Sequence, residues 1–123
     1  PPWSGGHVNL LAVMVGGALG SAIRYGLSVA MNPGPGEGMP WGTLAANVVG
    51  CLAIGWLSGQ LADSPEAVRL GVLVGVLGGF TTFSSFGLEA VRLMTAGQWG
   101  MAATYVLISN AGGLAGAWLG TRL

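Results

Sequence analysis

Charged residues are scarce in this chain, and lysine is absent altogether. Only 7% of the 123 residues are charged, whereas soluble domains carry about 25%. The charges cancel to a formal net charge of zero and come from Arg24, Arg69, Arg92, Arg122, Glu37, Asp63, Glu66 and Glu89. So few charges exclude a water-facing surface. Without a basic face, the chain is not expected to bind nucleic acid.

Residues that carry covalent or metal chemistry are equally scarce. Cys51 is the only cysteine, so the chain has neither an internal disulfide nor a pair of thiol ligands. His7 is the only histidine and has no cluster of Cys, His or acidic residues with which to share a metal ion. We therefore predict no catalytic residues and no enzymatic activity, and we interpret Cys51 as a small packing residue.

Apolar residues are abundant instead, at 52% of the chain, and they fall in long runs. A helix needs about 20 apolar residues to cross a hydrocarbon core, and four segments reach that length, at about 8–31, 41–62, 67–94 and 99–121. The first segment lacks the positively charged start of a signal peptide and is expected to remain a span. Because the connectors are short, residues 1–123 are predicted to form one all-α, multi-pass domain in the cell inner (plasma) membrane.

The arginines give little instruction about orientation in the bilayer. With four spans, Arg69 and Arg122 lie near one face of the membrane and Arg92 near the other. The positive-inside rule counts Lys and Arg near span ends, and a score of two to one hardly favours either topology. We therefore hypothesise that the chain inserts in both orientations and works as an antiparallel, dual-topology homodimer.

Glycine recurs at every fourth position in all four predicted spans. Small residues at this spacing let helix backbones approach closely where lipid gives no hydrophobic drive for association. The pattern consists of Gly16, Gly20, Gly55, Gly59, Gly71, Gly75, Gly79, Gly112, Gly116 and Gly120. These glycines are interpreted as packing surfaces of a close helical bundle.

Two polar residues inside the first and second spans call for a partner, because a polar group in hydrocarbon is unfavourable. Arg24 lies well inside the first span. It is either a structural donor to backbone carbonyls or a fixed positive charge that draws anions. Asn47 lies inside the second span, and its amide offers two N–H donors and one acceptor. Asn47 either joins helices or lines a polar path.

The sequence GVLGGFTTFSSFGLE predicts a break near the middle of the third span. Two glycines, two threonines and two serines within eight residues lower helix propensity and offer side chains that compete for backbone hydrogen bonds. Irregular backbone at bilayer depth is tolerated only where protein or a cavity surrounds it, and its free carbonyls can bind a cation. A break at the axis of a dimer would allow two copies to enclose one Na⁺.

The phenylalanines in this run are a second candidate feature. In helical geometry Phe83 and Phe86 share one face. They either pack the bundle or present the positive edges of their rings to an anion. The fourth span continues the supply of hydroxyl and amide groups with Thr104, Tyr105, Ser109 and Asn110.

Three segments in this order resemble the CrcB/Fluc fluoride channel family: GGALGSAIRYGLS, WGTLAANVVGCLAIG and GVLGGFTTFSSFGLE. The resemblance covers nearly the whole chain, and the combination is specific although each piece alone is weak. It implies a dual-topology homodimer that passively exports F⁻ through two pores, with a structural Na⁺ at the dimer centre.

The resemblance also implies roles for individual residues. The candidate fluoride pathway consists of Asn47, Phe83, Phe86, Thr43, Ser84, Tyr105, Ser109 and Arg24. The carbonyls of Gly78 and Thr81 match those that hold the Na⁺. One departure is that the chain reads Gly113 and then Ala117 where hydroxyls of a polar track are expected.

Two alternatives remain open from the residues alone. A small multidrug-type exchanger of cations and protons also has four short spans, but it needs a carboxylate in the first span, and none is present. Glu89 lies three residues before Arg92, where a helical ion pair is the simplest interpretation. A non-transporting helical subunit would leave the polar groups at Asn47 and in the third span without a purpose.

Overall fold

The computed structural model describes residues 4–123 and is entirely helical in that part of the chain, apart from turns and connectors. Residues 1–3 of the predicted domain lie outside the described residues. The helices are α1 (Ser4–Met31), α2 (Trp41–Gln60), α3 (Glu66–Leu70), the π-helical turn η1 (Gly71–Val76), α4 (Leu77–Phe80), α5 (Ser84–Thr95) and α6 (Trp99–Arg122). The all-helical fold expected from the long apolar runs is therefore confirmed.

Three segments of the described chain are long and apolar enough to cross a membrane: Gly5–Met31, Trp41–Gln60 and Glu66–Thr95. Each lies within a few residues of a predicted span. The fourth predicted span corresponds to α6, which is long enough at 24 residues. Its glycines, hydroxyl residues and Asn110 reduce its hydropathy, so composition alone does not identify α6 as a span.

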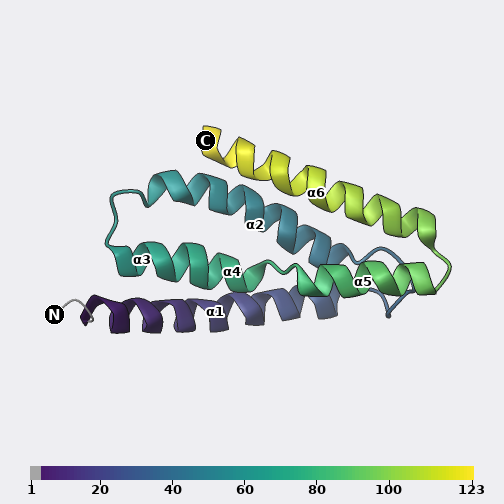
Figure 1. The fold of residues 1–123 in the computed structure, drawn as a ribbon, viewed down its shortest axis with the longest axis horizontal. Helices are drawn as coiled ribbons and strands as arrows, with labels where there is room; N and C mark the ends of the chain where they lie inside the picture. The colour runs from purple at the N-terminus through teal and green to yellow at the C-terminus, as the bar shows by residue number, and fades with distance from the viewer. Residues whose placement is uncertain (1–3) are drawn as a thin grey trace.

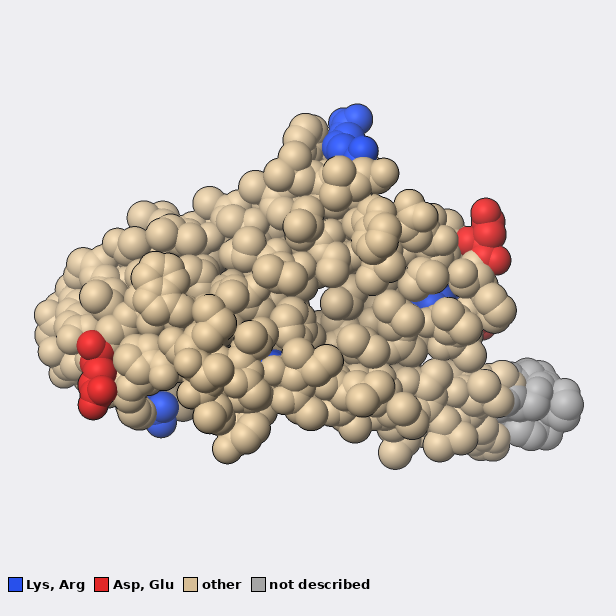
Figure 2. Space-filling model, turned by 180° about the vertical axis from the view of Figure 1, so that it is seen from behind, with Lys and Arg blue, Asp and Glu red and all other residues tan. Residues whose placement is uncertain are grey.

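The helices form two side-by-side pairs (Figure 1). In one pair α6 lies along α2. In the other, α1 lies along the row formed by α3, η1 and α4. Figure 2 shows that most charged side chains visible on this face stand near its edges, and that only small parts of others show between uncharged atoms. Such a surface fits a lipid environment.

Glycines form the contact within each pair, as their spacing predicted. A Cβ added to Gly20 would meet the Phe80 nitrogen at 2.8 Å, and one added to Gly79 would meet the Gly17 carbonyl at 2.7 Å. In the other pair, a Cβ on Gly120 would meet the Trp56 nitrogen at 2.7 Å. Gly59 is an exception, because the space around it is open.

The connectors turn sharply at glycines. Gly36 in the α1–α2 connector and Gly97 between α5 and α6 have φ angles of 73° and 79°, which side chains rarely adopt. The Gly97 turn also closes α5, because the amide of Gln98 donates to the Leu93 carbonyl at 2.8 Å. This end of the molecule thereby holds α5 and α6 together.

Candidate functional site

The third helical row, which consists of α3, η1, α4 and α5, is interrupted at residues 81–83, between the end of α4 and the start of α5. Thr81 is extended, with φ −92° and ψ 155°. A helix that stops and restarts inside a long apolar segment leaves backbone groups without their usual partners. The hydrogen bonds of residues 78–85 therefore decide what this region can do.

Asn47 replaces the missing partners of Thr82. The Asn47 side-chain oxygen accepts from the Thr82 amide at 2.9 Å, and the Asn47 side-chain nitrogen donates to the Thr82 carbonyl at 3.1 Å. Since the amide group of Asn carries two hydrogens, one N–H donor remains available. Asn47 thus holds the interruption against α2 and keeps a donor beside it.

Arg24 and the Thr82 hydroxyl replace further backbone hydrogen bonds that the interruption removes. The Arg24 side chain donates through Nε to the Gly79 carbonyl at 3.2 Å, which agrees with the interpretation of Arg24 as a donor to backbone. The amide of Ser85 donates to the Thr82 hydroxyl oxygen at 3.4 Å and so gives α5 a weak N-terminal cap. Ser84 is exposed, and its hydroxyl lies 3.3 Å from that of Thr82.

These changes of hydrogen-bond partner leave two carbonyls without their helical donors. In a continuous helix the Thr82 amide would donate to Gly78 and the Ser85 amide to Thr81, but both amides donate to side chains instead. The space beside the Gly78 Cα is open. Within residues 4–123 no group of three His, Cys, Asp or Glu side chains could hold a metal ion. A cation bound here would therefore rely on neutral oxygens, such as the two released carbonyls.

A cavity of about 380 Å³ opens beside the interruption. It is lined by Asn47, Cys51, Gly78, Thr81, Thr82, Phe83, Phe86, Ser109 and Asn110. All side chains in this lining are neutral, and several can donate a hydrogen bond. The structure thus brings together six predicted site residues from α2, the third helical row and α6.

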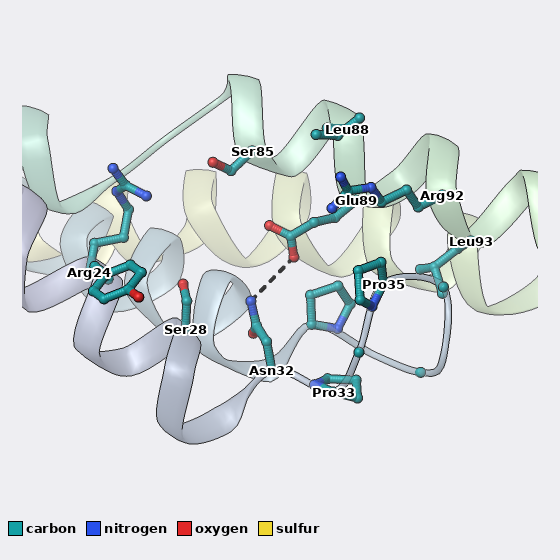
Figure 3. Close-up of a pocket in the computed structure, with 15 residues that line it drawn as sticks. Arg24, Ser28, Asn32, Pro33, Pro35, Ser85, Leu88, Glu89, Arg92 and Leu93 are labelled. Atoms are coloured by element: carbon teal, nitrogen blue, oxygen red, sulfur yellow. Dashed lines mark hydrogen bonds between the residues drawn. The ribbon is translucent and has the colours of Figure 1, made fainter.

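The charged residues of the site line a second cavity, of about 260 Å³ (Figure 3). Arg24, Glu89 and Arg92 line it, and the α1–α2 connector with its prolines forms part of the wall. Figure 3 shows the Glu89 carboxylate turned towards Asn32. A cavity with two arginines and one acid has a positive balance, which attracts anions.

The carboxylate of Glu89 is held by Thr43. The Thr43 hydroxyl lies 2.8 Å and 3.1 Å from the two carboxylate oxygens, and Thr43 is only 1% exposed. Asn32 joins the same cluster from the end of α1. The hydrogen bonds of Glu89 thus run to α2 and α1, and the predicted simple pairing with Arg92 does not describe its role. Sequence reasoning missed Asn32, although an Asn directly before the Pro-rich connector was a visible signal.

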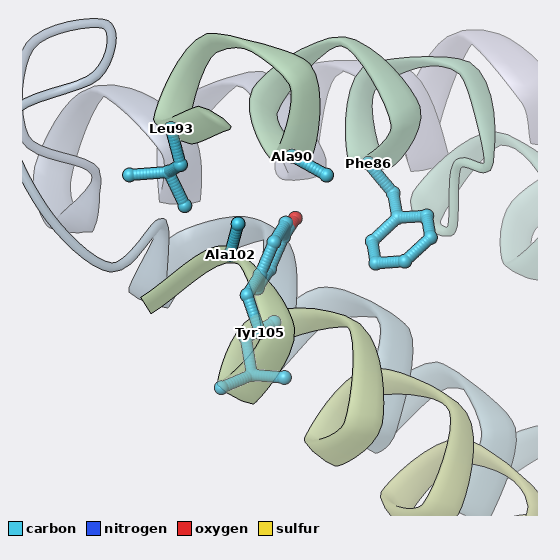
Figure 4. Close-up of a cluster of buried hydrophobic side chains, with 6 residues drawn as sticks. Phe86, Ala90, Leu93, Ala102 and Tyr105 are labelled. Atoms are coloured by element: carbon cyan, nitrogen blue, oxygen red, sulfur yellow. The ribbon is translucent and has the colours of Figure 1, made fainter. Parts of the chain in front are cut away.

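Phe83 and Phe86 lie close together but in different surroundings. Their ring centroids are 5.7 Å apart. Phe83 is 82% exposed, because it precedes α5, whereas Phe86 is 9% exposed and packs in the core (Figure 4). The αR backbone of Phe83 (φ −91°, ψ −35°) and the lining of one cavity by both rings agree with the expectation that Phe83 and Phe86 lie on one side. Within this single chain, Phe86 fits the packing interpretation as well as the anion-edge one.

Tyr105 and Ser109 place buried hydroxyls on α6. The Tyr105 ring lies 5.1 Å from that of Phe86, and its hydroxyl end points towards α5 (Figure 4). Tyr105 is 0% exposed, and neither hydroxyl oxygen has a hydrogen-bond partner among the described residues. Thr104 and Asn110 instead bond to carbonyls of their own helix. Buried hydroxyls without partners are unfavourable unless something binds them.

A family model described as CrcB-like protein, Camphor Resistance (CrcB), matches residues 11–121. The chain belongs to this family. The match spans α2 to α5, nearly all of α6 and α1 from residue 11 onward, so both cavities lie inside it.

Relatives from several bacteria match over most of their length. A fluoride-specific ion channel FluC from Roseiflexus sp. (strain RS-1) is 42% identical over 116 residues, which cover 92% of this chain and 94% of the relative. A protein of the same name from Azotobacter vinelandii is 45% identical over the same length with the same coverage. Another from Sphingopyxis alaskensis is 50% identical over 109 residues, or 86% of each chain.

Proposed function

We propose that this chain is a fluoride-selective ion channel that lets F⁻ leave the cell passively across the plasma membrane. The observation that carries the proposal is the neutral, donor-lined cavity beside the interruption of the third helical row. The names of its relatives, which are fluoride-specific ion channels, point to the same ion. A channel breaks no covalent bond, so we propose no enzymatic activity.

The proposed path uses neutral donors in place of water. Fluoride is small and strongly hydrated, so an ion in a narrow pore needs close donors such as the free N–H of Asn47 and the hydroxyl of Ser109. Ring edges of Phe83 and Phe86 add a weaker positive potential. Because these groups carry no full charge, they can replace water without trapping the anion, as conduction requires.

Arg24 and Arg92 are proposed to raise the local concentration of anions at the charged cavity. Thr43 contributes through Glu89, since its hydroxyl is occupied by the carboxylate. Tyr105 is proposed to serve the path through its unpartnered hydroxyl.

We further propose four spans, with the interruption serving as the functional break in the third, and an antiparallel homodimer with two pores. Support comes from groups that lipid would not tolerate: the exposed Ser84 hydroxyl and the non-helical backbone before it, which is only partly buried in the single chain. Phe83, which is exposed in the single chain, would then lie against the partner. The weak arginine asymmetry is compatible with insertion in both orientations.

The break fits a structural Na⁺. The Gly78 and Thr81 carbonyls are freed from their helical donors, and the open space beside Gly78 leaves room for an ion. These two carbonyls from each of two copies would hold the ion, which would neutralise their partial negative charges and fix the two breaks together.

Replacing Na⁺ by N-methylglucamine during purification and assay is expected to lower fluoride flux at least about threefold and to weaken the dimer, since facing carbonyls then repel. Flux and dimer content by chemical cross-linking measure the two effects. The control restores Na⁺ before the assay. Unchanged flux and dimer content in thoroughly Na⁺-free protein contradict the ion site.

Neither alternative function gains support. Glu89 is the only acid that lines the two cavities, and its carboxylate is bound by Thr43 and Asn32. This leaves a cation–proton exchanger without a free acid on the path. A non-transporting subunit would not need the donor-lined cavity.

The direct test is efflux of fluoride from liposomes that contain the purified protein, followed with a fluoride electrode. We expect rapid loss of fluoride and no measurable loss of chloride from matched vesicles. Protein-free liposomes are the control. Efflux no faster than in those vesicles would refute the proposed function.

The phenylalanine rings provide a sharper test of the path. If Phe83 and Phe86 only pack, then Phe83→Ile and Phe86→Ile are mild changes, because apolar core swaps of similar volume usually cost less than about 1.5 kcal/mol. We expect both variants to remain folded and to lose fluoride flux about tenfold, since an aliphatic side chain has no positive edge.

Leu107→Ile, at an exposed position of α6, is the matched control and is expected to leave flux unchanged. Flux at the wild-type rate in both phenylalanine variants would assign the rings to packing alone.

A further inference from the structure

Asn32, immediately after α1, connects three helices at the edge of the charged cavity. Its side-chain oxygen accepts from the backbone amides of Gly42 at 2.7 Å and Thr43 at 3.2 Å. Its side-chain nitrogen donates to the Thr43 hydroxyl oxygen at 3.1 Å and lies 3.5 Å from a carboxylate oxygen of Glu89. Asn32 thus contacts α2 and α5 from the end of α1 (Figure 3).

The acceptor half of the Asn32 amide caps α2. The residue that precedes α2 is Pro40, and no side chain from that position caps the helix. The first amides of a helix have no partner within it. Asn32 supplies the missing acceptor from another helix, which makes one half of its amide structural.

The donor half of the amide has a different consequence. A threonine hydroxyl has a single hydrogen, and the Thr43 oxygen already accepts from Asn32. The Thr43 hydrogen is therefore free to be donated to Glu89, at 2.8 Å. The direction of donation runs from Asn32 to Thr43 to Glu89.

This direction of donation keeps the Glu89 carboxylate against α2. Arg24 and Arg92 line the same cavity, and a carboxylate released into it would neutralise their attraction for an anion and repel the anion directly. Two donors on one side of the carboxylate hold it at the α2 wall of the cavity, which Glu89 lines together with both arginines.

We propose that Asn32 is a positioning residue for anion entry, which acts by donating through Thr43 to fix the Glu89 carboxylate at the α2 wall of the cavity that Arg24 and Arg92 also line. The inference rests on the proposed fluoride conduction. It assigns to the end of α1 a role in permeation in addition to capping α2.

Asn32→Asp separates the two roles of the amide. The aspartate keeps an acceptor for the Gly42 and Thr43 amides, so the cap on α2 is retained. It loses the donor and places a second negative charge beside Glu89. We expect a protein that still folds, with a melting temperature lowered by the repulsion between the two carboxylates, and a fluoride flux reduced about tenfold.

Rescue distinguishes positioning from a general structural effect. In the double variant Asn32→Asp with Glu89→Gln, the glutamine amide can donate to the aspartate, so the direction of donation is reversed and the added charge is compensated. We expect the double variant to recover at least about threefold in flux over Asn32→Asp. If the loss of flux in the double variant equals the product of the losses in Asn32→Asp and Glu89→Gln, the proposal is overturned. Wild-type flux in Asn32→Asp would overturn it as well.

Thr43→Val gives a second test that leaves both backbone caps in place. It removes the hydroxyl that links Asn32 to Glu89, and we expect the same reduction of about tenfold. Wild-type flux in Thr43→Val overturns the proposal even if Asn32→Asp does not fold. Asn9→Asp, the same chemical change at a position inside α1, is the control and should leave flux unchanged. Lack of fluoride flux in wild type would refute the channel itself, whereas normal wild-type flux with unaffected variants refutes only the positioning role.

Discussion

Asn47→Asp is expected to reduce fluoride flux about a hundredfold. Asn47 both donates to and accepts from the backbone of Thr82. An aspartate can still accept, but it turns a carboxylate oxygen towards the Thr82 carbonyl and removes both N–H donors. A buried polar group left unpaired costs about 1–3 kcal/mol, and a negative charge beside the path repels the anion as well. Fluoride efflux from liposomes measures the loss.

Asn47→Ser is the informative companion variant. It adds no charge but is too short to hold Thr82 at both groups, so it isolates the loss of the bridge. We expect flux between that of wild type and that of Asn47→Asp, and the Asn9→Asp protein again serves as control. Asn47→Asp with flux within a factor of two of wild type would show that neither bridge nor donor matters.

Fixing the orientation of the chain should remove nearly all activity. Ala96 is exposed in the turn between α5 and α6. Thr95→Lys with Ala96→Lys reverses the weak arginine bias and should retain this turn in the cytoplasm. If the working unit is antiparallel, a population with one orientation cannot form it, and we expect flux below about a tenth of wild type.

Co-expression provides the control for this experiment. A second copy carrying Ala62→Lys with Asp63→Lys, in the turn between α2 and α3, is biased towards the opposite orientation. Each variant alone should be inactive, and the two together should restore flux. Full activity from a single oriented variant rules out the antiparallel dimer.

The sequence predicts a break in the third span from a cause that is local. Two glycines, two threonines and two serines weaken a helix wherever they stand together. The structure places the non-helical residues at 81–83, inside that run. The glycine contacts within each helix pair were predictable for a similar reason. The spacing of glycines along one helix decides which of its faces lets a neighbouring backbone approach closely.

The partners of the polar residues were not predictable, because each lies far away in the chain. Asn47 bonds to a residue 35 positions later, and Arg24 to one 55 positions later. Helical spacing places Glu89 beside Arg92, yet its hydrogen bonds run to Thr43, 46 positions earlier. Local pattern identifies a polar group that needs a partner, whereas only the packing of helices selects that partner.

The composition of α6 has a consequence for biosynthesis. Its hydroxyls, glycines and Asn110 leave it less apolar than the three other long segments, so its entry into lipid by itself is less favourable. Its glycine face fits α2, which leaves the ribosome about 40 residues earlier. The last helix therefore depends on a previously inserted one as its docking surface. Substitutions in the α2–α6 seam are expected to act first on the yield of correctly inserted chains, before any effect on the path itself.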